Sequence, residues 1–286
     1  MSNGAAMEVD KEREFVLTDR DFAFLADLVG RHTGIKLNAG KRELVYGRLA
    51  RRLRQLGLTS FTDYCKLLTD DNDEELLNLV NAITTNLTSF FRERHHFEYL
   101  ARQVVPHLLV KNAATRKIRI WSAGCSTGAE PYSIAITMLE ALRDARNWEV
   151  EITASDIDTN VLHTAERGVY AQKEVDGISP ERLRRWFLRG KAANGGKVRA
   201  KDELRNLITF RRVNLIEQWP FAGPFDIIFC RNVVIYFEKD TQKQLFNRYA
   251  EVMVPDGHLF IGHSESLFRV CDRFQLLGQT IYRRVS

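Results

Sequence analysis

The sequence predicts an α/β protein, with a doubly wound, mainly parallel sheet, a small N-terminal all-helical domain and a small antiparallel β insertion. From residue 117 onward, short apolar runs alternate with helical segments, which is typical of βαβ units. A glycine turn over residues 124–128 joins one apolar run to a helix. Residues 17–112, in contrast, show a helical pattern throughout, and residues 15–92 are assigned to the helical domain. These three observations predict two folded parts of different class.

Length and composition describe an ordinary globular protein. The chain has 286 residues, of which 44% are hydrophobic and 28% charged, enough for one large domain and a smaller one. No apolar run reaches membrane-spanning length, and the polar N-terminus is unlike a signal peptide. We therefore expect a cytoplasmic protein with a disordered leader over residues 1–14 and no direct membrane insertion.

Cysteine and histidine spacing favours neither disulfides nor a metal site. Among seven histidines, only His95 and His96 are adjacent. The formal net charge of +5 permits an acidic partner, so nucleic acid, anionic lipid and acidic protein all stay open on charge alone. The four cysteines are scattered without C-x-x-C spacing: Cys65, Cys125, Cys230 and Cys271.

The N-terminal domain is expected to span residues 15–92. Its first helix has clear signals at both ends. Thr18 and Asp21 resemble a capping box, and Gly34 is expected to end the helix. Further helices are expected over residues 40–56, from residue 60, and after the acidic run 70–75.

The helix over residues 40–56 carries basic side chains beside an apolar stripe that includes Val45 and Leu49. Basic residues on a surface helix are most often only solvated. The alternative is a docking face for an acidic surface. The residues concerned are Lys41, Arg48 and Arg51 along one flank, with Arg52 at its boundary.

Residues 84–92 form a polar segment that leads into two phenylalanines and an arginine. One interpretation is a joint between helices, with Thr88 or Ser89 as a cap. A linker helix is predicted over residues 93–112, before the first strand.

The first βαβ unit contains the strongest signal for a ligand. A strand over residues 118–121 leads through Gly124 and Gly128 to a helix with Pro131 in its first turn. The next strand, near residues 148–156, ends at Asp156, where a nucleoside ribose would offer two hydroxyl groups. Dinucleotide enzymes and methyltransferases share this geometry, although the loop lacks the G-x-G-x-x-G pattern of a dehydrogenase.

The rest of the chain completes the sheet. A β insertion is expected over about residues 171–206, with a helix capped by Ser179 and a hairpin at Asn194-Gly195; it is either inert or a docking site. Polar residues follow the predicted strands and should converge on one crevice: Glu130, Asp156, Asn214, Arg231 and Asn232. Further strands are predicted over residues 207–213, 225–230, 257–262 and 274–284, with a helix over 240–254.

Seven short motifs follow one another along the chain: TTNLT at 84–88, FFR at 90–92, STGAEPYS at 126–133, ASDID at 154–158, FDIIFCRN at 225–232, IYF at 235–237 and GHSE at 262–265. In this order and spacing they resemble the CheR family of chemotaxis receptor methyltransferases, from about Thr18 onward. Ala129 departs from the family, which commonly has an acid there. The resemblance implies a class I methyltransferase domain over residues 113–286.

The resemblance also implies a chemistry and a site. The donor would be S-adenosylmethionine, with S-adenosylhomocysteine as product, and receptor glutamates would become γ-glutamyl methyl esters during sensory adaptation. Arg92 and Tyr236 match the residues nearest the transferred methyl. The residues that match cofactor contacts are Asn86, Thr88, Arg92, Glu130, Asp156, Asn214, Leu215, Arg231 and Asn232.

The implied partners are methyl-accepting chemoreceptors in membrane arrays. The basic helix with Lys41, Arg48, Arg51 and Arg52 would face the methylation region, and the β insertion would bind a C-terminal receptor pentapeptide in some members. We expect a monomer that binds no nucleic acid. Two alternatives stay open: a methyltransferase for RNA or a small molecule, and a scaffold that binds ligands without turnover.

Overall fold

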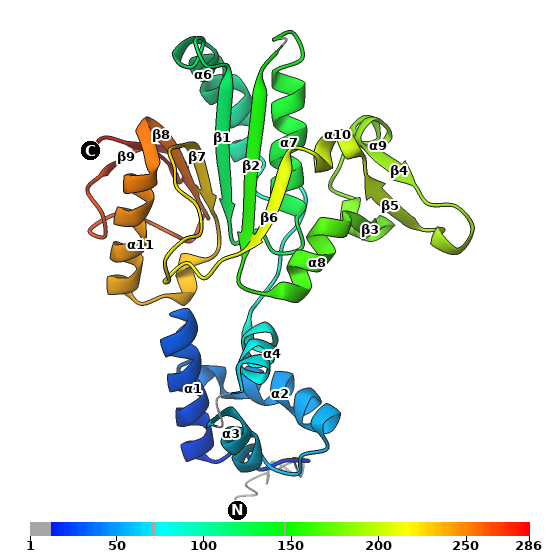
Figure 1. Ribbon diagram of the computed structural model, residues 1–286, viewed down its shortest axis with the longest axis vertical. Helices are drawn as coiled ribbons and strands as arrows, with labels where there is room; N and C mark the ends of the chain where they lie inside the picture. Colours follow the sequence, from blue (N-terminus) through cyan, green and yellow to red (C-terminus); the bar gives the residue numbers. More distant parts are fainter. Residues whose placement is uncertain (1–12, 70–71, 146) are drawn as a thin grey trace, which may run out of the picture. The chain divides into compact units, whose positions relative to one another are not determined.

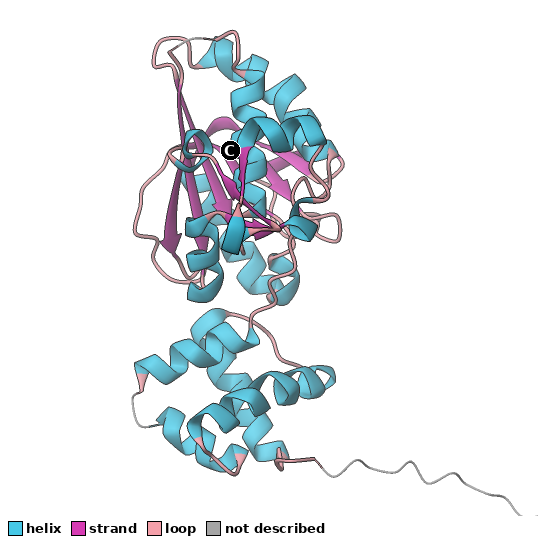
Figure 2. Cartoon of the chain, turned by 90° about the vertical axis from the view of Figure 1, so that its right-hand side faces the viewer, coloured by secondary structure: helices cyan, strands magenta, loops and turns pink. Residues whose placement is uncertain are grey.

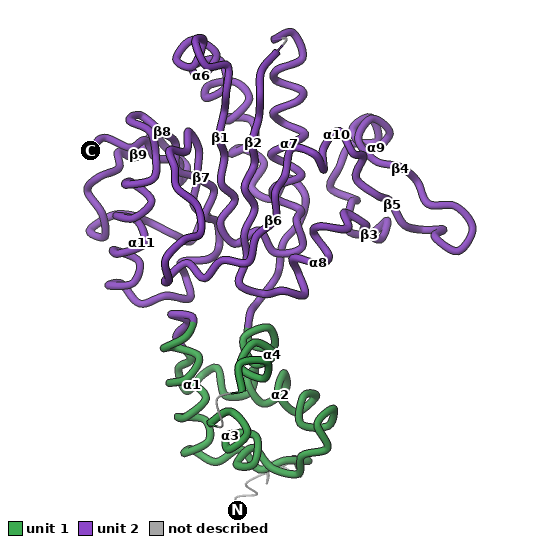
Figure 3. Tube along the Cα trace, in the orientation of Figure 1, with its two compact units in different colours: residues 1–32, 37–83 green, residues 33–36, 84–286 purple. Residues whose placement is uncertain are grey.

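The computed structural model (Figures 1 and 2) describes residues 13–69, 72–145 and 147–286. They form two compact units, coloured separately in Figure 3: residues 13–32 with Leu37–Ile83, and Thr33–Lys36 with Thr84–Ser286. The predicted leader lies, up to residue 12, outside the described residues. The boundary predicted after residue 92 falls after Ile83, because hydrogen bonds tie residues 84–92 to the second unit.

The first unit consists of helices whose ends follow local sequence signals. The capping box is present, since the Asp21 N–H donates to Thr18 Oγ1 and the Thr18 N–H donates to Asp21 Oδ2, both at 3.1 Å. Gly57 ends α2 in the left-handed region, at φ 66°. The helices are α1 (Asp19–Thr33), η1 (Ala39–Lys41), α2 (Arg42–Leu56), α3 (Phe61–Thr69) and α4 (Asp73–Ile83).

The second unit is built on a seven-stranded sheet in the order β6-β2-β1-β7-β8-β10-β9. The first five of these strands run parallel, and β10 and β9 close the sheet as antiparallel neighbours, as predicted. The strands are β1 (Lys117–Ala123), β2 (Glu149–Asp156), β6 (Ile208–Arg212), β7 (Phe225–Cys230), β8 (Met253–Ile261), β9 (Phe274–Gly278) and β10 (Ile281–Arg284).

Helices cover both faces of this sheet (Figures 1 and 2), so the predicted doubly wound architecture is confirmed. On β1, Ile118 and Ile120 join one buried cluster with α5 to α7, whereas Trp121 joins a second cluster with α11. This alternation follows from the two-residue period of a strand. The helices are α5 (His95–Tyr99), the π-helical η2 (Leu100–Val104), α6 (Val105–Lys111), α7 (Ala129–Ala141), α8 (Thr159–Arg167), η5 (Val234–Tyr236) and α11 (Lys239–Val252).

The β insertion forms a separate three-stranded antiparallel sheet in the order β3-β5-β4. The predicted hairpin is present between β4 and β5, and Ser179 caps α9 by accepting the Arg182 N–H at 3.3 Å. Its elements are β3 (Val169–Ala171), η3 (Gln172–Val175), α9 (Pro180–Trp186), β4 (Phe187–Arg189), η4 (Ala192–Asn194), β5 (Lys197–Ala200) and α10 (Asp202–Arg205). No helix in the described part of the chain is long and apolar enough to cross a membrane.

Candidate functional site

The carboxyl ends of neighbouring parallel strands bring most of the predicted site residues to one edge of the sheet. Strand β1 lies between β2 and β7, with Ala123 opposite Ser155 and Ser122 opposite Phe229. Asp156 is the last residue of β2, and Arg231 directly follows β7. The common edge therefore arises from the topology of the sheet.

The loop after β1 contains two glycines at positions that disfavour any larger residue. Gly124 and Gly128 have φ values of +86° and +91°. A Cβ on Gly124 would lie 2.4 Å from Val233 Cγ2, and one on Gly128 would lie 2.8 Å from Ala165 Cβ. The N–H groups of residues 124 and 125 both donate to the Ser155 carbonyl at 2.8 Å, which ties this loop to β2.

Asp156 is a buried acceptor at the tip of β2. Its Oδ2 accepts the Ser126 N–H at 2.8 Å, and its Oδ1 accepts the Asp158 N–H at 3.0 Å. Burial raises the pKa of Asp156 to about 6, although these two backbone N–H groups favour the ionised form. The Ile157 N–H also acts on this carboxylate, so of its about four lone-pair sites about one stays available to a ligand hydroxyl group.

Residues 84–92 lie against the same strand ends. Thr84 Oγ1 and Asn86 Nδ2 donate to Asp158 Oδ2 at 2.8 and 2.7 Å, and Ser126 Oγ donates to the Asn86 carbonyl at 3.0 Å. Asp158 also accepts the N–H groups at the start of α8. The sequence reasoning did not assign Asp158 a role, although an acid two residues after Asp156 was a visible signal.

Arg231 is the centre of a buried ion network. Its side chain is 3% exposed and lies 3.1 Å from Glu130 and 3.4 Å from Glu93, and it also donates to the Arg92 carbonyl. Burial raises the pKa of Glu130, while the Arg231 charge and the Ser122 hydroxyl at 2.7 Å oppose this rise. Arg231 thus fastens residues 92–93 to the end of β7.

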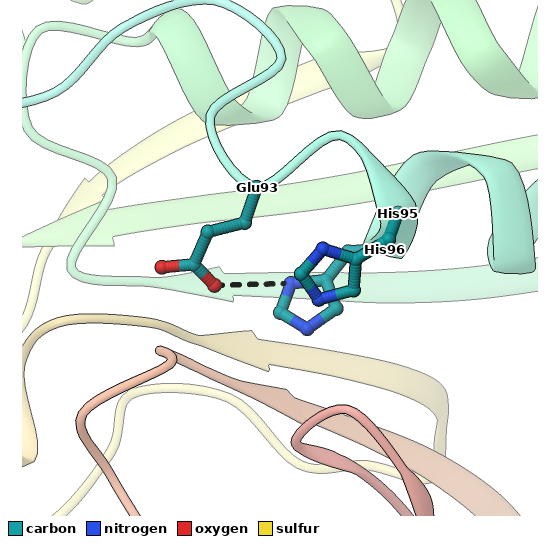
Figure 4. Close-up of side chains that lie close together, drawn as sticks. All are labelled: Glu93, His95 and His96. Atoms are coloured by element: carbon teal, nitrogen blue, oxygen red, sulfur yellow. Dashed lines mark ion pairs between the residues drawn. The ribbon is translucent and has the colours of Figure 1, made fainter.

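Glu93, His95 and His96 bring possible metal ligands within 4.8 Å of one another, and Glu93 lies 3.5 Å from His96 (Figure 4). Burial opposes ionisation of Glu93, but the His263 hydrogen bond and the Arg231 charge outweigh it and lower its pKa to about 2. Burial, assisted by Arg231, lowers the pKa of His96 to about 3. Because a guanidinium already neutralises this carboxylate, the cluster is a poor site for a metal cation.

Arg92 and Tyr236 both have partly buried side chains. Arg92 Nη1 donates to the Leu87 carbonyl at 2.8 Å, which folds the guanidinium back over its own segment. The Tyr236 carbonyl accepts the Lys36 N–H at 2.9 Å, so residues 33–36 hold the turn η5.

Three further predicted residues lie in loops after β6 and β7. Asn214 Nδ2 donates to Glu217 Oε1 at 2.8 Å, so its amide stabilises its own turn. Leu215 is 8% exposed and packs in the cluster beneath α11. Asn232 has a left-handed backbone with φ +59°, and its N–H donates to Glu265 at 2.9 Å.

The basic residues of the first unit divide into two groups. Arg52 Nη2 lies 2.5 Å from Glu75, whose side chain is 4% exposed and also accepts the Tyr64 hydroxyl at 2.7 Å. Arg52 therefore neutralises a buried acid of its own unit. Arg48 donates to the Ile83 carbonyl, whereas Lys41 and Arg51 are exposed.

Comparison with known proteins accounts for both units. The family described as CheR methyltransferase, all-alpha domain, matches residues 20–84, and the CheR methyltransferase, SAM binding domain, matches residues 86–283.

Relatives cover almost the whole chain. Chemotaxis protein methyltransferase 2 of Pseudomonas aeruginosa is 47% identical over 94% of this chain and 95% of its own length. The chemotaxis protein methyltransferases of Salmonella typhimurium and Escherichia coli are 46% and 44% identical, over 94% and 93% of this chain and 92% and 91% of theirs. A solved geranyl diphosphate methyltransferase in complex with SAM is too distant to add to this, with 12% identity, a TM-score of 0.33, and coverage of 67% of this chain and 55% of its own.

Proposed function

The chain belongs to the CheR methyltransferase family, and from this premise we propose that it is a protein-glutamate O-methyltransferase. Its donor is S-adenosylmethionine, and its products are S-adenosylhomocysteine and γ-glutamyl methyl esters on chemoreceptors. The match of both family domains in order carries the proposal. The meeting of Asn86 and Asp156 at the 124–128 loop supports it, because a nucleoside needs acceptors and donors at such a strand end.

The donor set fits an adenosyl group. We assign the ribose to Asp156, whose remaining lone-pair capacity can accept a hydroxyl group. Glu130 and Arg231 act by holding residues 92–93 against β7. The other residues that would contact the cofactor are Asn86, Thr88, Arg92, Asn214, Leu215 and Asn232.

The reaction requires alignment more than acid–base chemistry. A glutamate side chain has a reference pKa near 4.3, so it is an ionised nucleophile at pH 7 without help from a base. When bound, the cofactor supplies a methyl group on a positively charged sulfur. Arg92 would hold the incoming carboxylate and the Tyr236 hydroxyl would orient its attacking oxygen. Such positioning contributes up to about 7–11 kcal/mol in favourable cases.

Two surfaces are proposed to bind the receptor. The exposed Lys41 and Arg51, with the partly exposed Arg48, form a basic face on and before α2 that suits an acidic helical surface. Strand β4 is an edge of the insertion sheet and can accept a receptor tail as an additional strand. Arg52 belongs to this face by sequence, but its ion pair with Glu75 makes its contribution to binding smaller.

The proposal is tested by transfer of a radiolabelled methyl group to receptor cytoplasmic fragments, with and without their C-terminal tails. A glutamyl ester releases methanol in alkali, whereas a methylated RNA base does not. Tyr236→Phe should lower kcat at least tenfold and keep S-adenosylhomocysteine affinity within threefold, whereas Arg92→Ala, which also removes a proposed cofactor contact, should lower both kcat and that affinity. Label that persists in alkali, or a protein that binds the cofactor without transfer to any receptor fragment, would contradict the proposal.

The basic face has its own test. Arg51→Glu should raise the KM for the receptor and leave cofactor affinity unchanged, because the residue is exposed and distant in sequence from the SAM binding domain. Glu14, which pairs with Arg54 in the same unit, offers a matched control as Glu14→Gln. If Arg51→Glu and the control have equal receptor kinetics, the basic residues of this helix are only solvated and do not bind the receptor.

A further inference from the structure

Glu265 is a buried carboxylate in the turn that follows β8. It is 5% exposed and accepts four backbone N–H groups. Its Oε1 accepts those of Val233 and Val234 at 2.9 Å each, and its Oε2 accepts those of Asn232 at 2.9 Å and Gly262 at 2.5 Å. Three of these donors belong to the loop after β7 and one to the end of β8.

Three consecutive N–H groups that converge in this way form an anion-binding nest. Asn232 makes the nest possible with its left-handed backbone at φ +59°, which turns its N–H toward the same point as those of the next two residues. In many proteins such a nest binds phosphate, but here the chain's own carboxylate occupies it. Burial raises the pKa of Glu265, while the N–H groups of Gly262, Asn232, Val233 and Val234 oppose this rise.

A second contact fastens the same two loops together. A Cβ on Gly262 would lie 2.4 Å from Asn232 Nδ2 and 2.7 Å from the Asn232 N atom, so only glycine permits this approach. The side chain of Val233, the next residue, packs against Gly124 in the glycine loop. A shift of residues 232–234 would therefore move both the Asn232 amide and the contact with the glycine loop.

We propose that Glu265 is a positioning residue for the cofactor site, which it shapes by holding residues 232–234 between the glycine loop and the end of β8. The proposal rests on the proposed function, because it takes Asn232 as a cofactor contact. His263 in the same turn hydrogen bonds to Glu93 at 2.8 Å, so one turn holds both the β7 loop and residues 92–93. The role of Glu265 is distinct from that of Arg92 and Tyr236, since it touches neither substrate nor cofactor.

The test compares Glu265→Gln with a matched control, Glu251→Gln, on an exposed acid of α11. The amide is isosteric, but its NH2 group faces N–H donors at one of the two oxygen positions. We expect S-adenosylhomocysteine affinity, measured by calorimetry, to fall at least tenfold. Amide hydrogen exchange at residues 232–234 should accelerate at least tenfold, while exchange in β1 and β2 stays unchanged. The control should match the wild type in both measurements.

Gly262→Ala provides a second route to the same loop without removing a charge. If Glu265→Gln yields no folded protein, this variant carries the test, with the same expected loss of affinity and the same local exchange. Wild-type affinity in either folded variant would overturn the role of Glu265. Loss of affinity with faster exchange throughout the sheet would also overturn it, since that pattern indicates general destabilisation. A wild-type protein that fails to bind the cofactor would instead contradict the proposed function.

Discussion

Replacement of Arg231 by alanine is the perturbation for which the structure predicts the largest effect. The guanidinium lies between two side chains that are about as buried as itself, with Glu130 9% and Glu93 10% exposed. Removal of one partner of a buried ion pair costs about 3–5 kcal/mol, because a charge is left without compensation. The Arg92 carbonyl loses its donor as well.

Proton binding limits this cost and gives it a characteristic pH dependence. In the variant, Glu130 can avoid an isolated charge by taking up a proton. Protonation of a carboxylate with a reference pKa near 4.3 costs at most roughly 4 kcal/mol at pH 7, because each pH unit above the pKa costs about 1.36 kcal/mol. At pH 5 the same step costs only about 1 kcal/mol. The folded variant binds more protons than its unfolded chain, so its unfolding free energy falls as pH rises from about 4.3 toward the raised pKa. We therefore expect a loss of about 3–5 kcal/mol at pH 7 and a clearly smaller loss at pH 5.

The assay is urea unfolding followed by tryptophan fluorescence. All four tryptophans lie in the second unit, so the signal reports on the unit that contains Arg231. Arg94→Ala is the matched control, because Arg94 is 79% exposed and its pair with Glu98 should contribute about 0–1 kcal/mol. If Arg231→Ala is within 1 kcal/mol of the wild type at pH 7, or loses equal stability at both pH values, the Arg231 guanidinium does not compensate the buried charge of Glu130.

Three further predictions concern the site and its supports. Affinity for S-adenosylhomocysteine, measured by calorimetry, should fall as pH drops below about 6, because protonation of Asp156 removes an acceptor. Asp156→Asn should abolish this pH dependence. A wild-type affinity that does not change with pH would contradict the prediction. Arg52→Ala should destabilise the helical unit by about 2–4 kcal/mol in circular-dichroism melts, since Glu75 stays buried without its partner, and an unchanged melt would argue against a buried pair. Lys36→Pro removes the N–H that donates to the Tyr236 carbonyl and should lower kcat at constant cofactor affinity. Lys36→Ala keeps that N–H and should retain kcat. Equal rates in both variants would show that this hydrogen bond does not position Tyr236.

The helices and strands and their ends could be predicted from the residues alone. The capping box at Thr18, the left-handed Gly34 after α1 and the serine cap of α9 are all found where local signals predicted them. The same holds for the succession of strands along the chain after the glycine turn and for the position of Asp156 at a strand tip. These features could be predicted because they depend on backbone geometry and on neighbours a few residues away.

Which charged groups meet, and what each one does, became visible only in the folded chain. Arg231 and Glu130 are 101 residues apart, and their pairing makes them a clamp for residues 92–93, a role that their motifs alone did not distinguish from cofactor binding. Arg52 resembled its exposed neighbours until Glu75, 23 residues away, was found buried against it. The physical reason is that a charge acquires its role from burial and from its partners, and long-range packing sets both.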